Sequence, residues 1–176
     1  MDQAESVVSP DPYVALAERA VRKYVTERRV VGPPLDPPSE MLGTAGVFVS
    51  IKKQGALRGC IGTFFPTEAT IAEEIVANAI KSATSDPRFP PIGADELDDL
   101  TLSVDVLSKP QPCTEDDLDP ARFGIIVESG WRRGLLLPAL DGVDSVAQQV
   151  DIARRKAGIG PDEPVELRRF TVESHA

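Results

Sequence analysis

The sequence is poor in the side chains that build metal centres and nucleophile–base pairs. Its 176 residues include only two cysteines, Cys60 and Cys113, and one histidine, His175. A structural zinc site takes four nitrogen or sulfur ligands, so these three side chains exclude an ordinary one. Because a chain terminus is usually frayed, His175 is also a poor general base, which excludes Ser-His-Asp and Cys-His catalysis within one chain.

Long apolar runs and extended basic segments are also missing. No apolar run approaches the roughly 20 residues that span a bilayer, and residues 1–5 lack the basic and apolar regions of a secretion signal. The formal net charge of −9 argues against nucleic-acid binding and against docking on anionic lipid. We therefore predict a cytoplasmic protein with no nucleic-acid or membrane partner, in which both cysteines are free thiols.

The apolar spacing predicts an α+β protein with an antiparallel sheet and flanking helices, preceded by a loose segment at residues 1–11. Thr70 and Asp144 are the expected caps of the second and third helices, and residues 110–120 are an expected acidic loop. The predicted helices are 12–29, 70–85 and 144–158, and the predicted strands are 47–52, 56–61, 100–106, 124–128, 134–137 and 165–172.

One hexapeptide, Leu57-Arg58-Gly59-Cys60-Ile61-Gly62, stands out at the end of the first predicted hairpin. Because the glycines have no side chains to shield the backbone, another group can approach the sulfur and the main-chain N–H groups. A neighbouring arginine favours thiolate over thiol. Three interpretations of Cys60 stay open: a small packed residue, a thiol that contacts a ligand or partner, and a covalent nucleophile.

The neighbours of Cys60 have structural and functional interpretations as well. Arg58 is either a structural ion-pair partner or a clamp for an anionic group, and the N–H groups at Gly59 and Gly62 either serve strand geometry or hold an anion. Asp86 and Arg88 bracket a proline in the stiff segment 86–91. They form either an internal salt bridge that fixes a turn or one wall of a ligand cleft.

One aromatic side chain lies outside these motifs. Trp131 follows the Ser129-Gly130 turn of the second predicted hairpin. Either the indole shields the hairpin, or it is exposed and marks a surface for a partner.

Four motifs in order resemble those of the AMMECR family, also called AmmeMemoRadiSam system protein A. They are residues 57–62, Asp86-Pro87-Arg88-Phe89-Pro90-Pro91, Gly134-Leu135-Leu136-Leu137-Pro138 and Lys156-Ala157-Gly158. The resemblance covers residues 12–174 and implies a single domain of two lobes with a cleft between them, and no characterised enzymatic activity. It also implies that the gene lies near those of a Memo-like protein and a radical SAM enzyme. Phe123 departs from the histidine or polar residue that many members carry there.

Residues and resemblance together predict a non-catalytic binding or scaffold protein. Its cleft around Cys60, with Arg58, Gly59, Gly62, Asp86 and Arg88, is expected to hold a small anionic ligand or a segment of a partner protein. The alternative is an enzyme that uses Cys60 as a nucleophile or acyl carrier and works with a Memo-like or radical SAM partner. We predict no metal and no cofactor bound by this chain itself.

Overall fold

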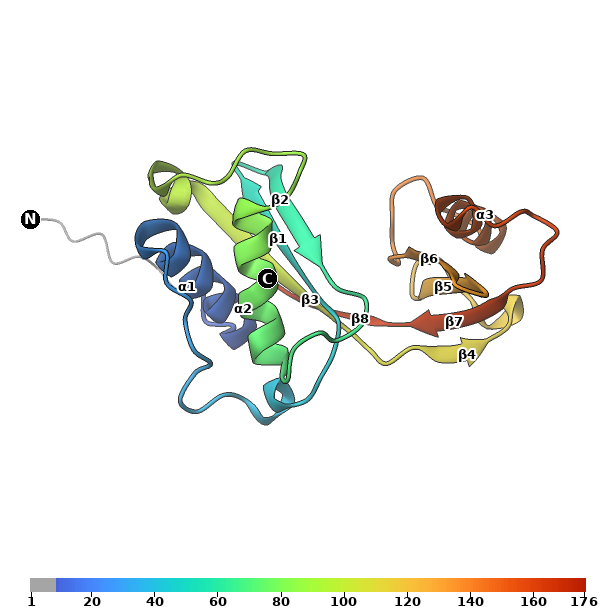
Figure 1. Ribbon diagram of the computed structural model, residues 1–176, viewed down its shortest axis with the longest axis horizontal. Helices are drawn as coiled ribbons and strands as arrows, with labels where there is room; N and C mark the ends of the chain where they lie inside the picture. The colour runs from blue at the N-terminus through green and yellow to red at the C-terminus, as the bar shows by residue number, and fades with distance from the viewer. Residues whose placement is uncertain (1–8) are drawn as a thin grey trace, which may run out of the picture. The chain divides into compact units, whose positions relative to one another are not determined.

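A computed structural model describes residues 9–176 and confirms the α+β class with antiparallel sheets (Figure 1). The chain divides into two compact units. The first runs up to Val106 and includes residues 174–176, and the second spans Leu107–Glu173. The predicted loose segment 1–11 falls outside the described residues as far as residue 8.

The first unit places two helices on one four-stranded sheet. The strands are β1 (Val47–Lys53), β2 (Ala56–Gly62), β3 (Leu100–Leu107) and β8 (Val172–His175), in the order β2-β1-β3-β8. Helices α1 (Pro12–Glu27) and α2 (Ile71–Thr84) lie side by side in front of this sheet in Figure 1. Short 3-10 helices, η1 (Ser39–Leu42) and η2 (Ala94–Asp99), lie in the connections.

Local chemistry sets the ends of these helices. The Asp11 carboxylate accepts the N–H groups of Tyr13 and Val14 ahead of α1, and Arg28 ends that helix in the left-handed conformation. Thr70 caps α2 as predicted, because its hydroxyl accepts the N–H of Glu73. Strand β1 buries Val47, Val49 and Ile51 toward the helices, so alternate side chains build the core.

The C-terminal end of the described chain is anchored to the start of α1. His175 stacks on Tyr13 with a ring-centroid distance of 3.9 Å. Its Nδ1 lies 2.8 Å from Asp11 Oδ2, on the same carboxylate that caps α1. The frayed terminus expected from the sequence is therefore wrong, since aromatic stacking and this hydrogen bond hold His175 in place.

The second unit has its own four-stranded sheet, with one helix against it. Its strands are β4 (Gln111–Cys113), β5 (Gly124–Ser129), β6 (Arg132–Leu136) and β7 (Glu166–Phe170), in the order β4-β7-β5-β6. A 3-10 turn, η3 (Glu115–Asp117), follows β4. Helix α3 (Val146–Ala157) packs against β5 and β6 and closes an apolar core that includes Ile125, Val127 and Val150.

Three predictions about this part of the chain need correction. Segment 110–120 contains strand β4, because Gln111–Cys113 pair with β7. Helix α3 begins after Ser145 rather than Asp144, since the Ser145 hydroxyl accepts the N–H of Gln148. The strand predicted over 165–172 is two strands that separate at Thr171 and join different sheets, and periodicity cannot show such a change of partner.

Candidate functional site

The Cys60 side chain lies on the face of the first sheet opposite to the helices. A Cβ on Gly59 would meet the Ser82 carbonyl oxygen of α2 at 2.1 Å, so residue 59 faces the helix and residue 60 faces away. On that face, Cys60 pairs across the sheet with Ser50 on β1, and Ser50 pairs with Ser103 on β3. The Sγ of Cys60 is 3.3 Å from Ser50 Oγ, and the thiol is half-buried.

The β1–β2 hairpin is held by a polar stripe that runs along α2 and past its end. Glu74, Asn78, Ser82 and Asp86 follow one another at intervals of four residues, and all four are buried. Residues four apart lie on one face of a helix, so the first three line the side of α2 that meets the hairpin. Each of the four side chains hydrogen-bonds to the hairpin or to the loop that follows it.

The Ser82 hydroxyl bridges the main chains of β1 and β2. It accepts the Ile61 N–H at 2.9 Å and donates to the Val49 carbonyl at 2.8 Å. Val49 and Ile61 are opposite each other in the ladder, so the serine bridges a pair of strands at the residue next to Cys60.

Glu74 closes the other end of the stripe. Its carboxylate accepts the hydroxyls of Thr63 and Thr67 and the main-chain N–H groups of Thr67 and Glu68. Burial raises the pKa of Glu74, but these hydrogen bonds outweigh burial and leave the pKa below its ordinary value. The loop after β2 is thereby fixed to α2.

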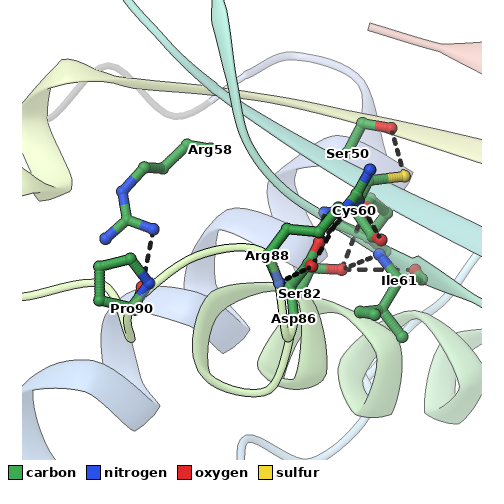
Figure 2. A network of polar contacts seen from close by, with 9 residues as sticks. Ser50, Arg58, Cys60, Ile61, Ser82, Asp86, Arg88 and Pro90 are labelled. Atoms are coloured by element: carbon green, nitrogen blue, oxygen red, sulfur yellow. Dashed lines mark hydrogen bonds and ion pairs between the residues drawn. The ribbon is translucent and has the colours of Figure 1, made fainter.

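Asp86 and Arg88 hold the backbone of Cys60 (Figure 2). The Asp86 carboxylate accepts the Cys60 N–H at 3.0 Å, and Arg88 Nη2 donates to the Cys60 carbonyl at 3.3 Å. Arg88 also forms a two-pronged pair with Asp86, through Nε at 3.0 Å and Nη2 at 2.8 Å. This guanidinium, together with the Cys60 N–H, holds the pKa of Asp86 far below its usual range, although the carboxyl is only 4% exposed.

The two halves of this ion pair differ in their exposure. The side chain of Arg88 is 55% exposed, while that of Asp86 is buried. Within residues 9–176, the Nη1 of Arg88 makes no hydrogen bond. The site therefore presents one guanidinium edge to solvent, anchored by a buried carboxylate.

Arg58 belongs to a separate cluster and points away from the Cys60 group toward Pro90 in Figure 2. Its guanidinium pairs with Glu96 through Nε at 3.0 Å and Nη2 at 3.1 Å, and it donates to the Pro90 carbonyl at 2.8 Å. The Arg58 pair, with the Gly93 N–H and Lys53, lowers the pKa of Glu96 to about 2. All three guanidinium nitrogens of Arg58 form hydrogen bonds within the protein, as expected of a structural ion-pair partner.

The two glycines of the hexapeptide are used by close packing within the protein. Gly59 lies under the Ser82 carbonyl, and a Cβ at Gly62 would lie 2.2 Å from the ring of Phe48, its partner across the sheet. The N–H groups nearest the thiol are taken by Asp86 at Cys60 and by Ser82 at Ile61. That either glycine also contacts a ligand stays a prediction.

The order and spacing of these residues agree with one family along almost the whole chain. The AMMECR1 family model matches residues 14–175. The chain belongs to the AMMECR1 family.

Relatives in this family span bacteria and archaea. A protein of Thermotoga maritima is 49% identical over 173 residues, which is 96% of this chain and 99% of that protein. A Clostridium acetobutylicum protein, CA_C1420, is 46% identical over 94% of this chain, which spans only 36% of its length. The crystal structure of the uncharacterised protein PH0010 from Pyrococcus horikoshii matches with a TM-score of 0.81 at 35% identity, covering 92% of this chain and 88% of that one.

The structure brings together some of the predicted site residues and adds others. Cys60, Asp86 and Arg88 form one cluster, whereas Arg58 joins Glu96. Sequence reasoning missed Ser50 and the buried stripe on α2, although its spacing of four residues at 74, 78 and 82 was a usable signal. Among residues 9–176, no group of three or more His, Cys, Asp or Glu side chains is placed to hold a metal ion, and no helix is long and apolar enough to cross a membrane.

Proposed function

We propose that this AMMECR1 chain is a non-catalytic binding protein whose site combines the Cys60 thiol with the exposed edge of Arg88. The observation that supports it is that the backbone of Cys60 is held in place while its side chain is left partly exposed. The backbone of residue 60 is fixed by Asp86 and Arg88, while its half-buried thiol lies on the face of the sheet opposite to α1 and α2. A fixed backbone with an accessible side chain is the arrangement of a pre-organised contact site.

The chemistry at this site favours an anionic group. Arg88 keeps Nη1 unengaged and more than half of its side chain exposed, and its planar fork suits a carboxylate or phosphate. Arg58, the other candidate clamp, has its nitrogens committed to Glu96 and to main-chain carbonyls. The expected ligand is therefore a small anion, or an acidic side chain on a segment of a partner protein, bound by Arg88.

The family resemblance supplies two candidate partners, a Memo-like protein and a radical SAM enzyme. The direct test is binding of the immobilised chain to each purified partner, alone and with its cofactors. Arg88→Met is expected to weaken binding at least about tenfold, the loss typical of one charge-assisted contact. Arg19→Met, which changes an exposed arginine of α1, is the matched control.

Two outcomes would overturn this proposal. One is the absence of binding to either partner together with no change in the amide spectra near Cys60 on titration with acetate or phosphate. The other is equal affinity of the Arg88→Met protein and its parent.

The second candidate is an enzyme that uses Cys60 as a nucleophile or acyl carrier. The Ser50 hydroxyl, 3.3 Å from the sulfur, favours it, because a hydroxyl partner orients a thiol and can share its proton. This candidate predicts fast alkylation of Cys60 that no longer rises between about pH 6 and about pH 8, as for a thiol already ionised. A rate that climbs steadily across that interval favours the binding protein.

A further inference from the structure

A pocket of the first unit lies between helix α2 and the segment that follows α1. Its volume is about 480 Å³, within the range of pockets that hold small molecules. Its apolar lining consists of Val30, Val31, Pro33, Val76, Ala77 and Ile80. Glu68, Glu73 and Lys81 complete the lining, so the pocket suits a ligand that has both apolar and charged groups.

The charged residues of this lining are separated along α2. Glu68 precedes the helix and Glu73 lies in its first turn, whereas Lys81 lies in its last turn. At a rise of about 1.5 Å per residue, the helix advances about 12 Å from residue 73 to residue 81. The pocket is therefore acidic at one end and basic at the other, with apolar surface between the two ends.

The three charged side chains are not used by the fold. Within residues 9–176, the carboxylates of Glu68 and Glu73 and the ammonium group of Lys81 form no ion pair and no hydrogen bond. A glutamate three residues after a helix cap often bonds back to the cap N–H; in the described structure Glu73 holds that position after Thr70 and does not form the bond. Both ends match the sign of the helix dipole, which stabilises α2 and leaves these charges able to pair with a ligand.

The wall of the pocket offers unpaired main chain. Val30 and Val31 belong to no helix or strand, and among the described residues their main-chain N–H and C=O groups form no hydrogen bond. Pro33, the next residue of the wall, precedes another proline and is therefore confined to an extended conformation. Unpaired main-chain groups of this kind can hydrogen-bond to an extended peptide.

We propose that this pocket binds a short apolar peptide with free ends, its ammonium group at Glu68 and Glu73 and its carboxylate at Lys81. An extended chain spans at most about 3.3–3.6 Å per residue, so three or four residues bridge the two charged ends. The peptide side chains then lie on the apolar floor that Ala77 and Ile80 form.

The charges select this ligand over simpler amphipathic molecules. A fatty acid pairs with Lys81 but places its tail against two carboxylates, and an alkyl amine pairs with the carboxylates but leaves Lys81 without a partner. A peptide satisfies both ends and also offers main-chain groups to Val30 and Val31. The pocket shares no residue with the site at Cys60, so neither proposal depends on the other.

The probe is the tripeptide valyl-alanyl-valine with free ends, titrated into the isotopically labelled protein and followed in amide NMR spectra. The amide signals of Val31, Ala77 and Ile80 are expected to shift, with a dissociation constant of about 0.1–1 mM for a ligand of this size. The N-acetylated and the C-amidated forms should each bind at least about fivefold more weakly, because each lacks one charge.

Matched variants assign each end of the peptide. Lys81→Met should weaken binding of the free peptide at least about fivefold and leave binding of the C-amidated form unchanged, because that form has no carboxylate for Lys81. The double variant Glu68→Gln/Glu73→Gln should likewise weaken binding of the free peptide and leave binding of the N-acetylated form unchanged.

Two further variants serve as controls. Lys52→Met removes an exposed lysine of β1 that does not line the pocket. Trp131→Ala removes an indole that is 92% exposed at the turn between β5 and β6, and that therefore does not shield its hairpin but offers apolar surface elsewhere. Both variants should bind the free peptide like the parent protein. Thermal unfolding of each variant checks that it is folded.

Three results would overturn the proposal. The first is an absence of shifts at Val31, Ala77 and Ile80 with up to about 10 mM peptide, well above the expected dissociation constant. The second is equal affinity for the free, N-acetylated and C-amidated peptides. The third is a Lys81→Met protein that loses affinity equally for the free and the C-amidated forms, which would place the carboxylate elsewhere.

Discussion

The two units of this molecule share two close-packing contacts, one between strand and helix and one between neighbouring strands. A strand glycine lies under a helix carbonyl in each: Gly59 under Ser82 of α2, and Gly134 under Ala153 of α3. A second strand glycine lies under the ring of a cross-strand phenylalanine: Gly62 under Phe48, and Gly124 under Phe170. Glycines of this kind therefore report close packing, and by themselves they do not mark a functional site.

The units differ in what surrounds the close contact. In each, a buried amide on the helix donates to a main-chain carbonyl, Asn78 to Val47 and Gln149 to Phe123. Around α2, however, Glu74, Ser82 and Asp86 extend this into a continuous polar stripe that ends at Cys60, whereas α3 buries only Gln149 among its polar residues. The polar stripe, rather than the glycines, distinguishes the region of the thiol.

The largest expected effect tests the shared contact between strand and helix. A Cβ would lie 1.9 Å from the Ala153 carbonyl oxygen at Gly134 and 2.1 Å from that of Ser82 at Gly59, so backbone must move in both units. Gly134→Ala and Gly59→Ala should each lower the free energy of unfolding by about 3 kcal/mol. Urea unfolding measures the loss. Gly32→Ala, where nothing lies within 4 Å, is the control and should change little.

The next effect separates the units. Ser82→Ala leaves the Ile61 N–H and the Val49 carbonyl without their bridge, and should lower the free energy of unfolding by about 2 kcal/mol. The exposed Ser85, three residues further on, is the matched control, and Ser85→Ala should be nearly neutral. If Ser82→Ala and Ser85→Ala lowered the free energy of unfolding equally, the polar stripe would contribute no stability beyond that of apolar packing.

Acid sensitivity should also differ between the units. The folded-state pKa of Asp86 lies below its ordinary value of 3.8, so its contribution is full above that value and is lost as pH falls toward the folded pKa. Asp86→Asn should therefore flatten the dependence of unfolding free energy on pH below about pH 5.

The matched variant in the second unit is Glu163→Gln. The pKa of Glu163 is also lowered, chiefly by its pair with Arg132, but its side chain is 40% exposed and solvent screens the pair. The flattening should be smaller than for Asp86→Asn. A larger effect at Glu163 would reverse this comparison of the two units.

The smallest expected effect concerns the link between β8 and α1. His175→Ala removes the stacking on Tyr13 and the bond to the capping carboxylate of Asp11, and should cost about 1 kcal/mol. Thermal unfolding measures it. An unchanged melting temperature would show that the C-terminal contact contributes no stability.

The sequence predicts those elements whose signals are local. The hairpin that carries Cys60 and the cap at Thr70 follow from alternation and from side-chain oxygens next to a helix. The partners of Arg58 and Cys60 do not, because Glu96 and Asp86 are 38 and 26 residues away and meet them only through the fold. The polar residues of the stripe on α2 repeat every four positions, but they were missed because the helix was predicted from its apolar residues alone.

Because partners distant in sequence cannot be predicted, the sequence also does not show which of Arg58 and Arg88 is available to bind an anion. Both arginines sit in family motifs, and either satisfies the requirement for a cation near the thiol. In the folded protein, Arg58 is enclosed by Glu96 and proline carbonyls, whereas Arg88 keeps an exposed edge beside Cys60. The predicted cleft between two lobes stays a prediction.

The most direct test of this account is alkylation of the native Cys113→Ser protein by iodoacetamide, followed by mass spectrometry and unfolding. Removing Cys113, a thiol whose pKa is raised by burial, leaves Cys60 as the single target. One adduct at Cys60 is expected under conditions in which the protein stays folded, because the sulfur lies on the face of the sheet opposite to α1 and α2. An absence of adduct until the chain unfolds would contradict it.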